Sequence, residues 1–391
     1  MFGGRSGEHE VSLLSASSIL KEIDRTRFDI VLIGINKAGH WLTSGGARGL
    51  LEGSKTAMPP GDVEDLPTTL RAGDPAATPG AKVLAGGHPA LLAPQPAESS
   101  NELSVVGESA LHGQALDVVF PVLHGTFGED GTMQGLFELA GIAYVGSGVL
   151  GSAAGMDKDV MKRLFAQAML PIVKHVTVLR ADWEKRPRKA VAQVEAALAY
   201  PVFVKPANLG SSVGISKAHN RAELGPALTL AAKYDRKLVV EQGVGGKKKK
   251  ARELEVAILG NDAPIASVVG EIVPGKEFYD YEAKYLSEGS VAVIPAKLSK
   301  AQTKQVREMA LAAFRACDLS GLARVDFLME PDGKQRIFLN EVNTMPGFTR
   351  ISMYPMLWEG SGVKAKELIS RLIELALEKH AEKSRTVFSR E

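Results

Sequence analysis

The chain has 391 residues, a length that predicts two or three domains rather than one core. Hydrophobic residues make up 45% and charged residues 24%, as in ordinary globular proteins, and the formal net charge of +2 gives no sign of a nucleic-acid or membrane partner. The single cysteine, Cys317, excludes internal disulfides and agrees with a cytosolic location. No apolar run approaches the ~20 residues that span a bilayer, and no signal peptide is recognisable.

The first third of the chain alternates between helix and strand patterns. Apolar residues at helical spacing predict a helix over residues 12–23, and buried-strand runs cover residues 28–35 and 116–122. This alternation predicts a layered, mostly parallel α/β domain. Residues 43–100 are rich in Gly, Pro and Ala, which predicts loops and short strands. The run at 116–122 ends in the glycine-rich loop 124–131, and such strand-end loops are where α/β sheets bind ligands.

A second region, residues 148–241, begins with a predicted helix over 157–168. Lys158 lies at the start of this helix and Lys205 at the end of the next predicted strand. Both are candidate cations for phosphate, although a lone lysine at such a position is usually only solvated. Glu241 ends the last strand of the region, where it either caps a turn or binds adenine or ribose.

A glycine- and serine-rich loop, residues 209–214, lies between the predicted strands that end at Lys205 and Glu241. Its glycines let the backbone approach a ligand, and its N–H groups with the hydroxyls of Ser211 and Ser212 form an anion-binding nest. A plain hairpin turn is the alternative, because short Gly/Ser loops are common. The sequence G-x-x-x-x-G-K-[ST] occurs nowhere, so any nucleotide is bound by another architecture than a P-loop.

The third region begins near residue 242. It contains a predicted strand over 253–259, a long amphipathic helix over 300–316 and a final helix near 363–377. A run of four lysines, residues 247–250, lies between two strands. Because no aromatic residues interleave with it, a solvated loop tip is favoured over a nucleic-acid site.

Residues 321–347 are the most informative stretch, because two alternating runs flank a Pro-Asp-Gly turn signal and predict a β-hairpin. Arg324 and Asp326 share a face of the first strand, and Glu341 and Asn343 share a face of the second. If the Asp-Gly pair forms the tight turn, Arg324 lies opposite Glu341 and all four side chains share one face. Oxygen ligands without His or Cys suit Mg²⁺ better than zinc, and Mg²⁺ beside an arginine suggests phosphoryl transfer. A surface salt-bridge ladder is the alternative.

Further candidates lie in loops. Glu8 precedes the first helix, where it either favours the first turn through the helix dipole or anchors an ammonium group. His124 opens the glycine-rich strand-end loop. Lys284 and Tyr285 lie in a polar aromatic stretch, residues 279–285, that reads either as a lid over a site or as a surface loop with buried tyrosine rings.

Together these motifs resemble the D-alanine–D-alanine ligase family, ATP-grasp enzymes of peptidoglycan precursor synthesis. The matching stretches follow the family order over nearly the whole chain and cover residues 3–13, 124–135, 144–147, 156–158, 204–206, 210–214, 279–285, 324–326 and 340–347. The resemblance implies an α/β (α+β ATP-grasp) fold. Its parts are an N-terminal substrate-binding α/β domain (1–147), a central ATP-grasp subdomain (148–241) and a C-terminal ATP-grasp subdomain with the metal-binding hairpin (242–391).

The resemblance also implies an activity, the ATP-dependent joining of two D-alanines through an acyl phosphate. ATP would be bound by Lys158, Lys205, Ser212, Glu241, Val244, Glu253 and Lys284. Two Mg²⁺ or Mn²⁺ ions would be held by Asp326, Glu341 and Asn343. The reacting D-alanines would be bound or activated by Glu8, His124, Ser211, Tyr285, Arg324, Gly347, Ser352 and Met353. Within that set, Glu8 would anchor the first ammonium group, and Arg324 with the Gly347 N–H would stabilise the oxyanion.

The remaining implications concern partners and specificity. The partners would be two molecules of D-alanine and, by family expectation, a second copy in a homodimer, with no nucleic acid and no membrane. Tyr285 favours D-alanine as the second substrate, because relatives that make D-alanyl-D-lactate tend to carry another residue there. Relatives also begin with a full hydrophobic strand, whereas only Met1 and Phe2 precede Gly3, so we expect a shortened first strand that affects the placement of Glu8.

Two alternatives stay open from the sequence. Another ATP-grasp carboxylate–amine ligase, for instance one that joins D-alanine to a different second substrate, would share Lys158, Lys205 and the metal-binding set. It would have no reason to share the stretch around Glu8 or residues 279–285. A non-catalytic nucleotide-binding or nucleic-acid-binding protein is the other alternative. The intact metal-binding set argues against the first version, and the balanced charge argues against the second.

Overall fold

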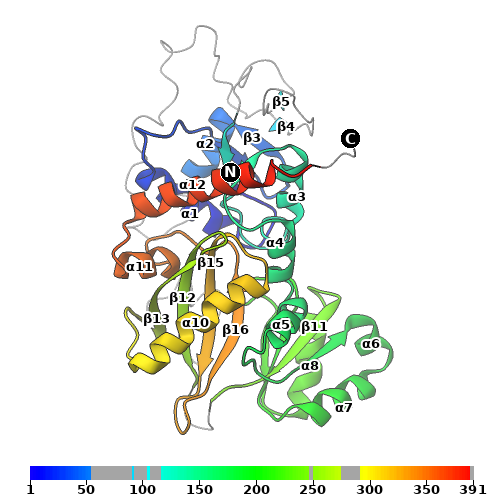
Figure 1. Cartoon of the computed structure of the whole chain (residues 1–391). Coiled ribbons are helices and arrows are strands. Elements are labelled where there is room, and N and C mark those ends of the chain that lie inside the picture. The colour runs from blue at the N-terminus through cyan, green and yellow to red at the C-terminus, as the bar shows by residue number, and fades with distance from the viewer. Residues whose placement is uncertain (54–89, 92–103, 106–115, 246–249, 274–290, 388–391) are drawn as a thin grey trace.

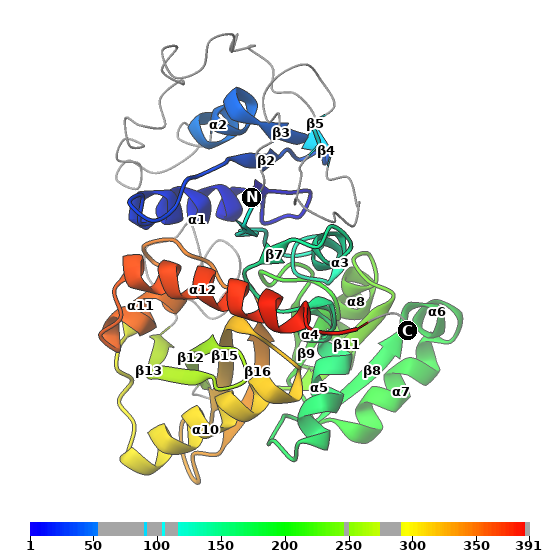
Figure 2. The same ribbon diagram turned by 45° about the horizontal axis from the view of Figure 1, so that its top comes forward.

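The computed structural model describes residues 1–53, 90–91, 104–105, 116–245, 250–273 and 291–387. Figure 1 shows three regions: an N-terminal region at the top, a four-stranded sheet at the lower right and a five-stranded sheet at the lower left. Helix α12 (Ala365–Lys383) runs between the N-terminal region and the five-stranded sheet (Figure 2) and contacts strands of both. The predicted mixture of helices and sheets is therefore found.

In its described residues, the N-terminal region combines short strands with three helices. Its elements are β1 (Phe2–Gly3), α1 (His9–Glu22), β2 (Ile33–Ile35), β3 (Trp41–Thr43), α2 (Ser44–Gly53), β4 (Ala90–Leu91), β5 (Ser104–Val105), β6 (Val118–Val119), α3 (Thr132–Leu139) and β7 (Ala143–Tyr144). Strand β1 pairs parallel with β2, β6 pairs parallel with β7, and a parallel bridge between Phe2 and Val122 joins the two pairs. The predicted parallel pairing thus holds at the centre, whereas β3 and the β4–β5 pair are antiparallel.

Three predictions in this region were inaccurate. Within the described chain, the strand predicted over 116–122 forms a ladder only at β6, with a single further bridge at Val122. The strand predicted over 28–35 forms a ladder only at β2, because the apolar side chains of residues 28–32 pack against separate cores without a strand partner among the described residues. Helix α2 was predicted as loop, since its sequence contains four glycines. Its Ala47 and Leu51 side chains are buried, so tertiary packing outweighs the weak helix propensity.

The central region is a four-stranded antiparallel sheet in the order β10-β9-β11-β8 with helices beside it. Its elements are α4 (Val149–Met156), α5 (Lys158–Gln167), β8 (His175–Leu179), α6 (Arg180–Lys185), α7 (Pro187–Ala197), β9 (Val202–Pro206), β10 (Ser216–Ala218), α8 (Arg221–Ala231) and β11 (Lys237–Gln242). The Asp157 side chain accepts the N–H groups of Asp159 and Val160, which fixes the start of α5 at Lys158. The predicted helix and both predicted strands of this region are confirmed within one or two residues.

The C-terminal region is a five-stranded antiparallel sheet in the order β14-β13-β12-β15-β16. Its elements are β12 (Arg252–Gly260), β13 (Ile265–Val273), β14 (Val291–Val293), α10 (Lys300–Ala316), β15 (Gly321–Met329), β16 (Ile337–Asn343), α11 (Met353–Gly360) and α12. Helix α10 lies across one face of the sheet (Figure 1) and begins with a capping box in which Ser299 and Gln302 exchange hydrogen bonds. This local signal explains why α10 has the predicted bounds.

The predicted hairpin is present as β15 and β16, but its register differs from the prediction. Asp326 lies opposite Glu341 and Arg324 lies opposite Asn343, not opposite Glu341 as predicted. The predicted tight turn at Asp332-Gly333 is wrong, because Met329 pairs with Ile337 and not with Arg336. The ladder is also interrupted between Asp326 and Phe327, where β16 carries one additional residue, Asn340. Because a one-residue shift turns a strand over, this bulge brings the two β16 ligands to the face that carries Arg324 and Asp326. The predicted shared face is therefore confirmed, although the predicted opposite partners were wrong.

Candidate active site

The predicted site residues gather around one cleft between the central sheet and the C-terminal sheet. The cleft has a volume of about 860 Å³ and receives side chains from the start of α5 and from β9, β11, β12, β15 and β16. The predicted residues that line it are Lys158, Lys205, Ser211, Ser212, Glu241, Val244, Glu253, Asp326, Glu341 and Asn343. Lys284 and Tyr285 lie outside the described residues. Motifs that are far apart in the sequence thus meet in one space large enough for a nucleotide.

The phosphate-binding candidates occupy the middle of the cleft. Lys158 donates a hydrogen bond to the Leu209 carbonyl at 2.7 Å, and its ammonium lies 3.9 Å from the Glu341 carboxylate. Burial lowers the pKa of Lys158, and Glu341 opposes this effect. Burial acts on Lys205 in the same direction, but Glu241, 2.8 Å away, together with Glu341 and Glu253, outweighs it and the pKa is raised. Two buried ammonium groups therefore line the same cleft as the candidate metal ligands of the β15–β16 hairpin.

Glu241 also lines the cleft, held between two lysines. Its carboxylate oxygens are 2.9 Å from Lys162 Nζ and 2.8 Å from Lys205 Nζ. Burial alone would raise the pKa of Glu241, but the two ammonium groups lower it to about 2. Glu241 lines the cleft as predicted, with both oxygens engaged by lysines. Lys162 was not singled out in the sequence, although its position four residues after Lys158 on α5 was the available signal.

The metal-binding candidates share one face of β15 and β16. Asp326 accepts two hydrogen bonds from Arg324 at 2.7 Å and one from the Asn343 amide at 2.9 Å. Arg324 also forms an ion pair with Glu255 at 3.0 Å, a β12 residue that the sequence analysis did not identify and that lies opposite Asp326 in the ladder. Arg324 is thus fixed by carboxylates on two neighbouring strands.

The donor chemistry of this face fits a divalent cation. In the part of the chain that the structure describes, no three His, Cys, Asp or Glu residues are arranged to hold a metal ion. The candidate set instead has the carboxylates of Asp326 and Glu341 and the amide of Asn343, all lining the cleft. Oxygen donors of this kind suit Mg²⁺ or Mn²⁺, which commonly take one or two carboxylates and complete their coordination with substrate phosphates and water.

Glu8 contacts the Gly/Ser loop across the boundary between the N-terminal and central regions. Ser211 donates a hydrogen bond to one Glu8 oxygen, as the predicted network requires. Ser211 and Ser212 both have left-handed backbone angles, with φ of 47° and 58°, so this loop is a strained turn that presents its N–H groups. A side chain at Gly210 would begin 2.7 Å from the other Glu8 oxygen, which explains the glycine at this close approach.

His124 is buried behind the segment that carries Gly347. Its ring nitrogens lie 2.8 Å from the Met345 carbonyl and 3.2 Å from the Ser15 hydroxyl, which in turn accepts the Phe348 N–H at 3.1 Å. Burial lowers the pKa of His124, and Glu8 opposes this effect. His124 therefore supports the backbone on both sides of Gly347 and does not line the cleft.

Ser352 and Met353 begin helix α11 beside this segment. The Ser352 hydroxyl accepts the Thr349 N–H at 3.0 Å, and a side chain at Gly347 would begin 2.8 Å from the same hydroxyl oxygen. Met353 is buried in the core beneath the sheet. The predicted second-substrate residues thus lie in a tight turn and helix start that follow β16.

Comparisons with known proteins agree over the whole chain. Models of the D-ala D-ala ligase N-terminus and C-terminus match residues 1–147 and 164–374. A D-alanine–D-alanine ligase from Heliobacterium modesticaldum is 49% identical, covering 99% of this chain and 96% of its own length. One from Geobacillus kaustophilus is 46% identical, covering 100% and 96%. This chain belongs to the D-alanine–D-alanine ligase family.

Solved structures related to this family share the fold. A D-alanine–D-alanine ligase from Coxiella burnetii matches with a TM-score of 0.77 at 32% identity, covering 98% of this chain and 94% of that chain. A D-Ala:D-Ser ligase from Enterococcus faecalis matches with a TM-score of 0.77 at 34% identity, covering 96% and 97%. The ATP-grasp fold expected from the sequence is confirmed. Among the described residues, no helix has the length and apolar character needed to cross a membrane.

In this member of the D-alanine–D-alanine ligase family, Glu129 is a further cleft residue that the sequence analysis did not identify. It accepts the Gly125 N–H at 2.7 Å with one oxygen, and the Met345 N–H at 3.1 Å with the other. It thereby ties the glycine-rich loop to the segment that leads to Gly347. Burial, with a smaller effect of Glu8, raises the pKa of Glu129 to about 8.

We expect Glu129→Gln to make stability less dependent on pH. In the native protein Glu129 keeps its proton up to a pH of about 8, whereas an ordinary glutamate releases it near 4.5. The unfolded chain therefore binds fewer protons in this interval, and the free energy of unfolding falls as pH rises. Glutamine does not titrate, so the free energy of unfolding of the variant, measured with urea, should fall less steeply between these pH values. Asp130→Asn in the same loop is the control. If the free energy of unfolding depended on pH equally in Glu129→Gln and in wild type, the raised pKa of Glu129 would be contradicted.

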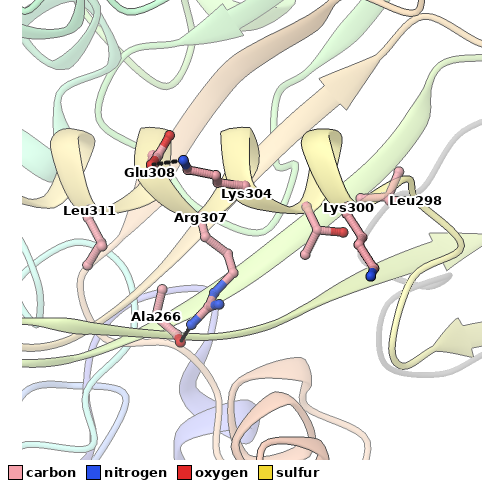
Figure 3. Close-up of a pocket in the computed structure, with 8 residues that line it drawn as sticks. Ala266, Leu298, Lys300, Lys304, Arg307, Glu308 and Leu311 are labelled. Carbon is pink, nitrogen blue, oxygen red and sulfur yellow. Dashed lines mark hydrogen bonds and ion pairs between the residues drawn. The ribbon is translucent and has the colours of Figure 1, made fainter.

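A second, smaller hollow of about 480 Å³ lies beside α10, away from the catalytic candidates of this ligase-family chain (Figure 3). Its charged side chains are engaged locally: Arg307 donates to the Ala266 carbonyl at 2.8 Å, and Lys304 lies 3.8 Å from Glu308. Leu298 and Leu311 supply its apolar wall. None of the predicted site residues lines it, so the cleft between the two sheets is the candidate active site.

Proposed function

We propose that this chain is an ATP-dependent D-alanine–D-alanine ligase that makes D-alanyl-D-alanine for peptidoglycan precursors, with ADP and phosphate as the other products. The observation that carries the proposal is the meeting of three groups around one cleft. These are the Glu8–Ser211 contact, the Lys158 and Lys205 ammonium groups, and the oxygen donors of the β15–β16 hairpin. Full-length relatives of the same family support it.

The reaction needs two steps, because a carboxylate is a poor electrophile. An oxygen of the first D-alanine carboxylate attacks the γ-phosphorus of ATP, the bond to ADP breaks, and an acyl phosphate forms. The amine of the second D-alanine then attacks the acyl carbon, loses a proton and forms the peptide bond as phosphate leaves. Lys158 and Lys205 would offset the charge on the transferring phosphoryl group, and Arg324 with the Gly347 N–H would stabilise the oxyanion of the second step.

Other residues of the chain would bind the metal ions, the nucleotide and the two D-alanines. Asp326, Glu341 and Asn343 would hold two Mg²⁺ or Mn²⁺ ions, whose chemistry is to neutralise phosphate oxygens. The adenine and ribose end would contact Glu241, Val244 and Glu253, with Ser212 and Lys284 nearer the phosphates. The first D-alanine would bind Glu8, supported by Ser211 and Tyr285, and the second would bind at Ser352 and Met353, with His124 behind them.

The same proposal divides the chain at residues 147 and 241 into the three parts expected from the sequence. The separate sheets of the fold support these boundaries. We also propose a cytoplasmic protein that forms a homodimer. The single buried cysteine supports the first point, and only the family resemblance supports the second.

The decisive experiment is D-alanine-dependent release of phosphate from ATP. Release with D-alanine alone, with D-alanyl-D-alanine as the product, is the expected result. Release only with another acid and amine would favour a different ATP-grasp ligase. ATP binding without turnover on any D-amino acid would favour a non-catalytic nucleotide-binding protein.

A second candidate differs only in the second substrate. It is favoured by the solved D-Ala:D-Ser ligase, which is as similar to this chain as the Coxiella burnetii enzyme is. Equimolar D-alanine and D-serine in one assay separate the two candidates, because the ratio of the two dipeptides reports selection of the attacking amine. A product that is mainly D-alanyl-D-serine would overturn the proposed second substrate while leaving the ligase activity in place.

A further inference from the structure

Lys162 is a fully buried lysine that the ligation steps above do not use. It lies on α5 one helical turn after Lys158, and its side chain is 0% exposed. Taking an ammonium group out of water is costly unless charged and polar partners replace the water. The partners of Lys162 therefore indicate why a lysine is retained beneath the cleft.

The partners come from two different sheets. The Lys162 ammonium is 2.9 Å from Glu241 on β11 and donates to the Asn340 backbone carbonyl on β16 at 3.2 Å. The second oxygen of Glu241 is 2.8 Å from Lys205. One side chain of α5 thus connects the central sheet, at the adenine end of the cleft, to the C-terminal sheet at its metal end.

Asn340 is the residue that the β16 bulge inserts. On the turn side of the bulge Phe327 pairs with Leu339, and beyond it Asp326 pairs with Glu341. If the first register continued, Asn340 would lie opposite Asp326, and Glu341 would point to the other face of the sheet. The bulge is therefore what directs Glu341 into the cleft, and Lys162 binds the carbonyl at the bulge itself.

We infer that Lys162 is a positioning residue that holds the Asn340 bulge, and through it Glu341, in register with the nucleotide end of the cleft. Its ligand class is a divalent cation bound together with a nucleoside diphosphate or triphosphate, so the inference rests on the proposed function for the identity of the ligands. Lys162 touches neither ligand in this assignment. It acts through Asn340 and Glu241.

The test is Lys162→Met, which leaves Glu241 in a one-to-one pair with Lys205 and so leaves no buried carboxylate without a cation. Mn²⁺ binding to the protein–ADP complex, followed by electron paramagnetic resonance, should weaken by ~10–100-fold, the range found when supporting contacts of metal ligands are removed. Lys162→Arg keeps a cation and N–H donors in nearly the same volume and should bind Mn²⁺ within about threefold of wild type.

Lys237→Met is the matched control. Lys237 is also buried and also pairs with carboxylates next to α5, Asp157 and Asp159, but it does not line the cleft. It should lower the melting temperature as Lys162→Met does, with Mn²⁺ affinity unchanged within about twofold. This control separates general loss of stability from loss of positioning.

Three results would overturn the inference. One is a folded Lys162→Met that binds Mn²⁺–ADP within twofold of wild type, and another is a Lys237→Met that weakens Mn²⁺ binding equally. If Lys162→Met does not fold, Lys162→Arg decides, because a folded arginine variant with a tenfold weaker Mn²⁺ complex contradicts the role of charge and donors. Wild-type turnover with D-alanine is measured separately, so failure of the proposed function is distinguished from failure of this inference.

Discussion

Glu341→Gln should abolish turnover and leave the protein folded. Glu341 lies opposite Asp326 on the shared face of the hairpin, 3.9 Å from the Lys158 ammonium, and its side chain is 22% exposed to the cleft. The substitution keeps the shape but removes the charge that a divalent cation needs. We expect kcat to fall by at least ~10²–10³, the range for losing one transition-state electrostatic contact. Initial rates of ADP formation at saturating ATP, Mg²⁺ and D-alanine measure this effect.

Glu330→Gln is the matched control for Glu341→Gln. Glu330 lies on the same hairpin but next to its turn, where it pairs with Arg336 away from the cleft. Its loss should leave kcat within about twofold of wild type, because an exposed pair of this kind contributes little. Retained activity in Glu341→Gln, with a normal melting temperature, would remove Glu341 from the metal site.

Local signals in the sequence predicted the elements that carry the site. Helix α5 begins where Asp157 caps it, and α10 begins at the capping box of Ser299, so both could be placed from neighbouring residues alone. The hairpin was predicted from its alternation and turn residues. In each case the determining interactions lie within a few positions of one another in the chain.

The register of the hairpin could not be predicted in the same way. The prediction assumed a tight turn at Asp332-Gly333 and an uninterrupted ladder, whereas Met329 pairs with Ile337, one position beyond that turn's register, and β16 also contains the Asn340 bulge. The carbonyl of Asn340 is bound by Lys162, 178 positions earlier in the chain. A bulge held by so distant a donor leaves no mark in the alternation of the strand, so only the shared face was predictable.

Residues that were not predicted from the sequence also have partners that are distant in the chain. Glu129 is fixed by Met345 and Glu255 by Arg324, and these partners are distant in the sequence. A lone Glu or Lys in a helix or strand is usually solvated, so sequence reasoning assigns it to the surface. The buried charged residues of this protein can be recognised only from the packing of its sheets against each other. They are concentrated around the cleft.

Arg324→Met is expected to have the second large effect, on both rate and stability. Arg324 contacts Asp326 twice at 2.7 Å and Glu255 at 3.0 Å, and these two carboxylates lie opposite each other on adjacent strands. Without the guanidinium group the two partly buried carboxylates repel each other and lose their cation, so the variant should be less stable than wild type. The loss of the proposed oxyanion donor should lower kcat by ~10²–10³.

Arg252→Met separates the two effects of Arg324→Met. Arg252 also binds a carboxylate through two nitrogens, Glu271 at 2.7 and 2.6 Å, in the same sheet, but it does not line the cleft. Its loss should lower the melting temperature and leave kcat within about twofold of wild type. Steady-state kinetics and thermal unfolding of both variants provide the comparison. If Arg324→Met lowered kcat no more than Arg252→Met, Arg324 would be only the cation that holds Glu255 and Asp326 together, and the oxyanion would need another donor.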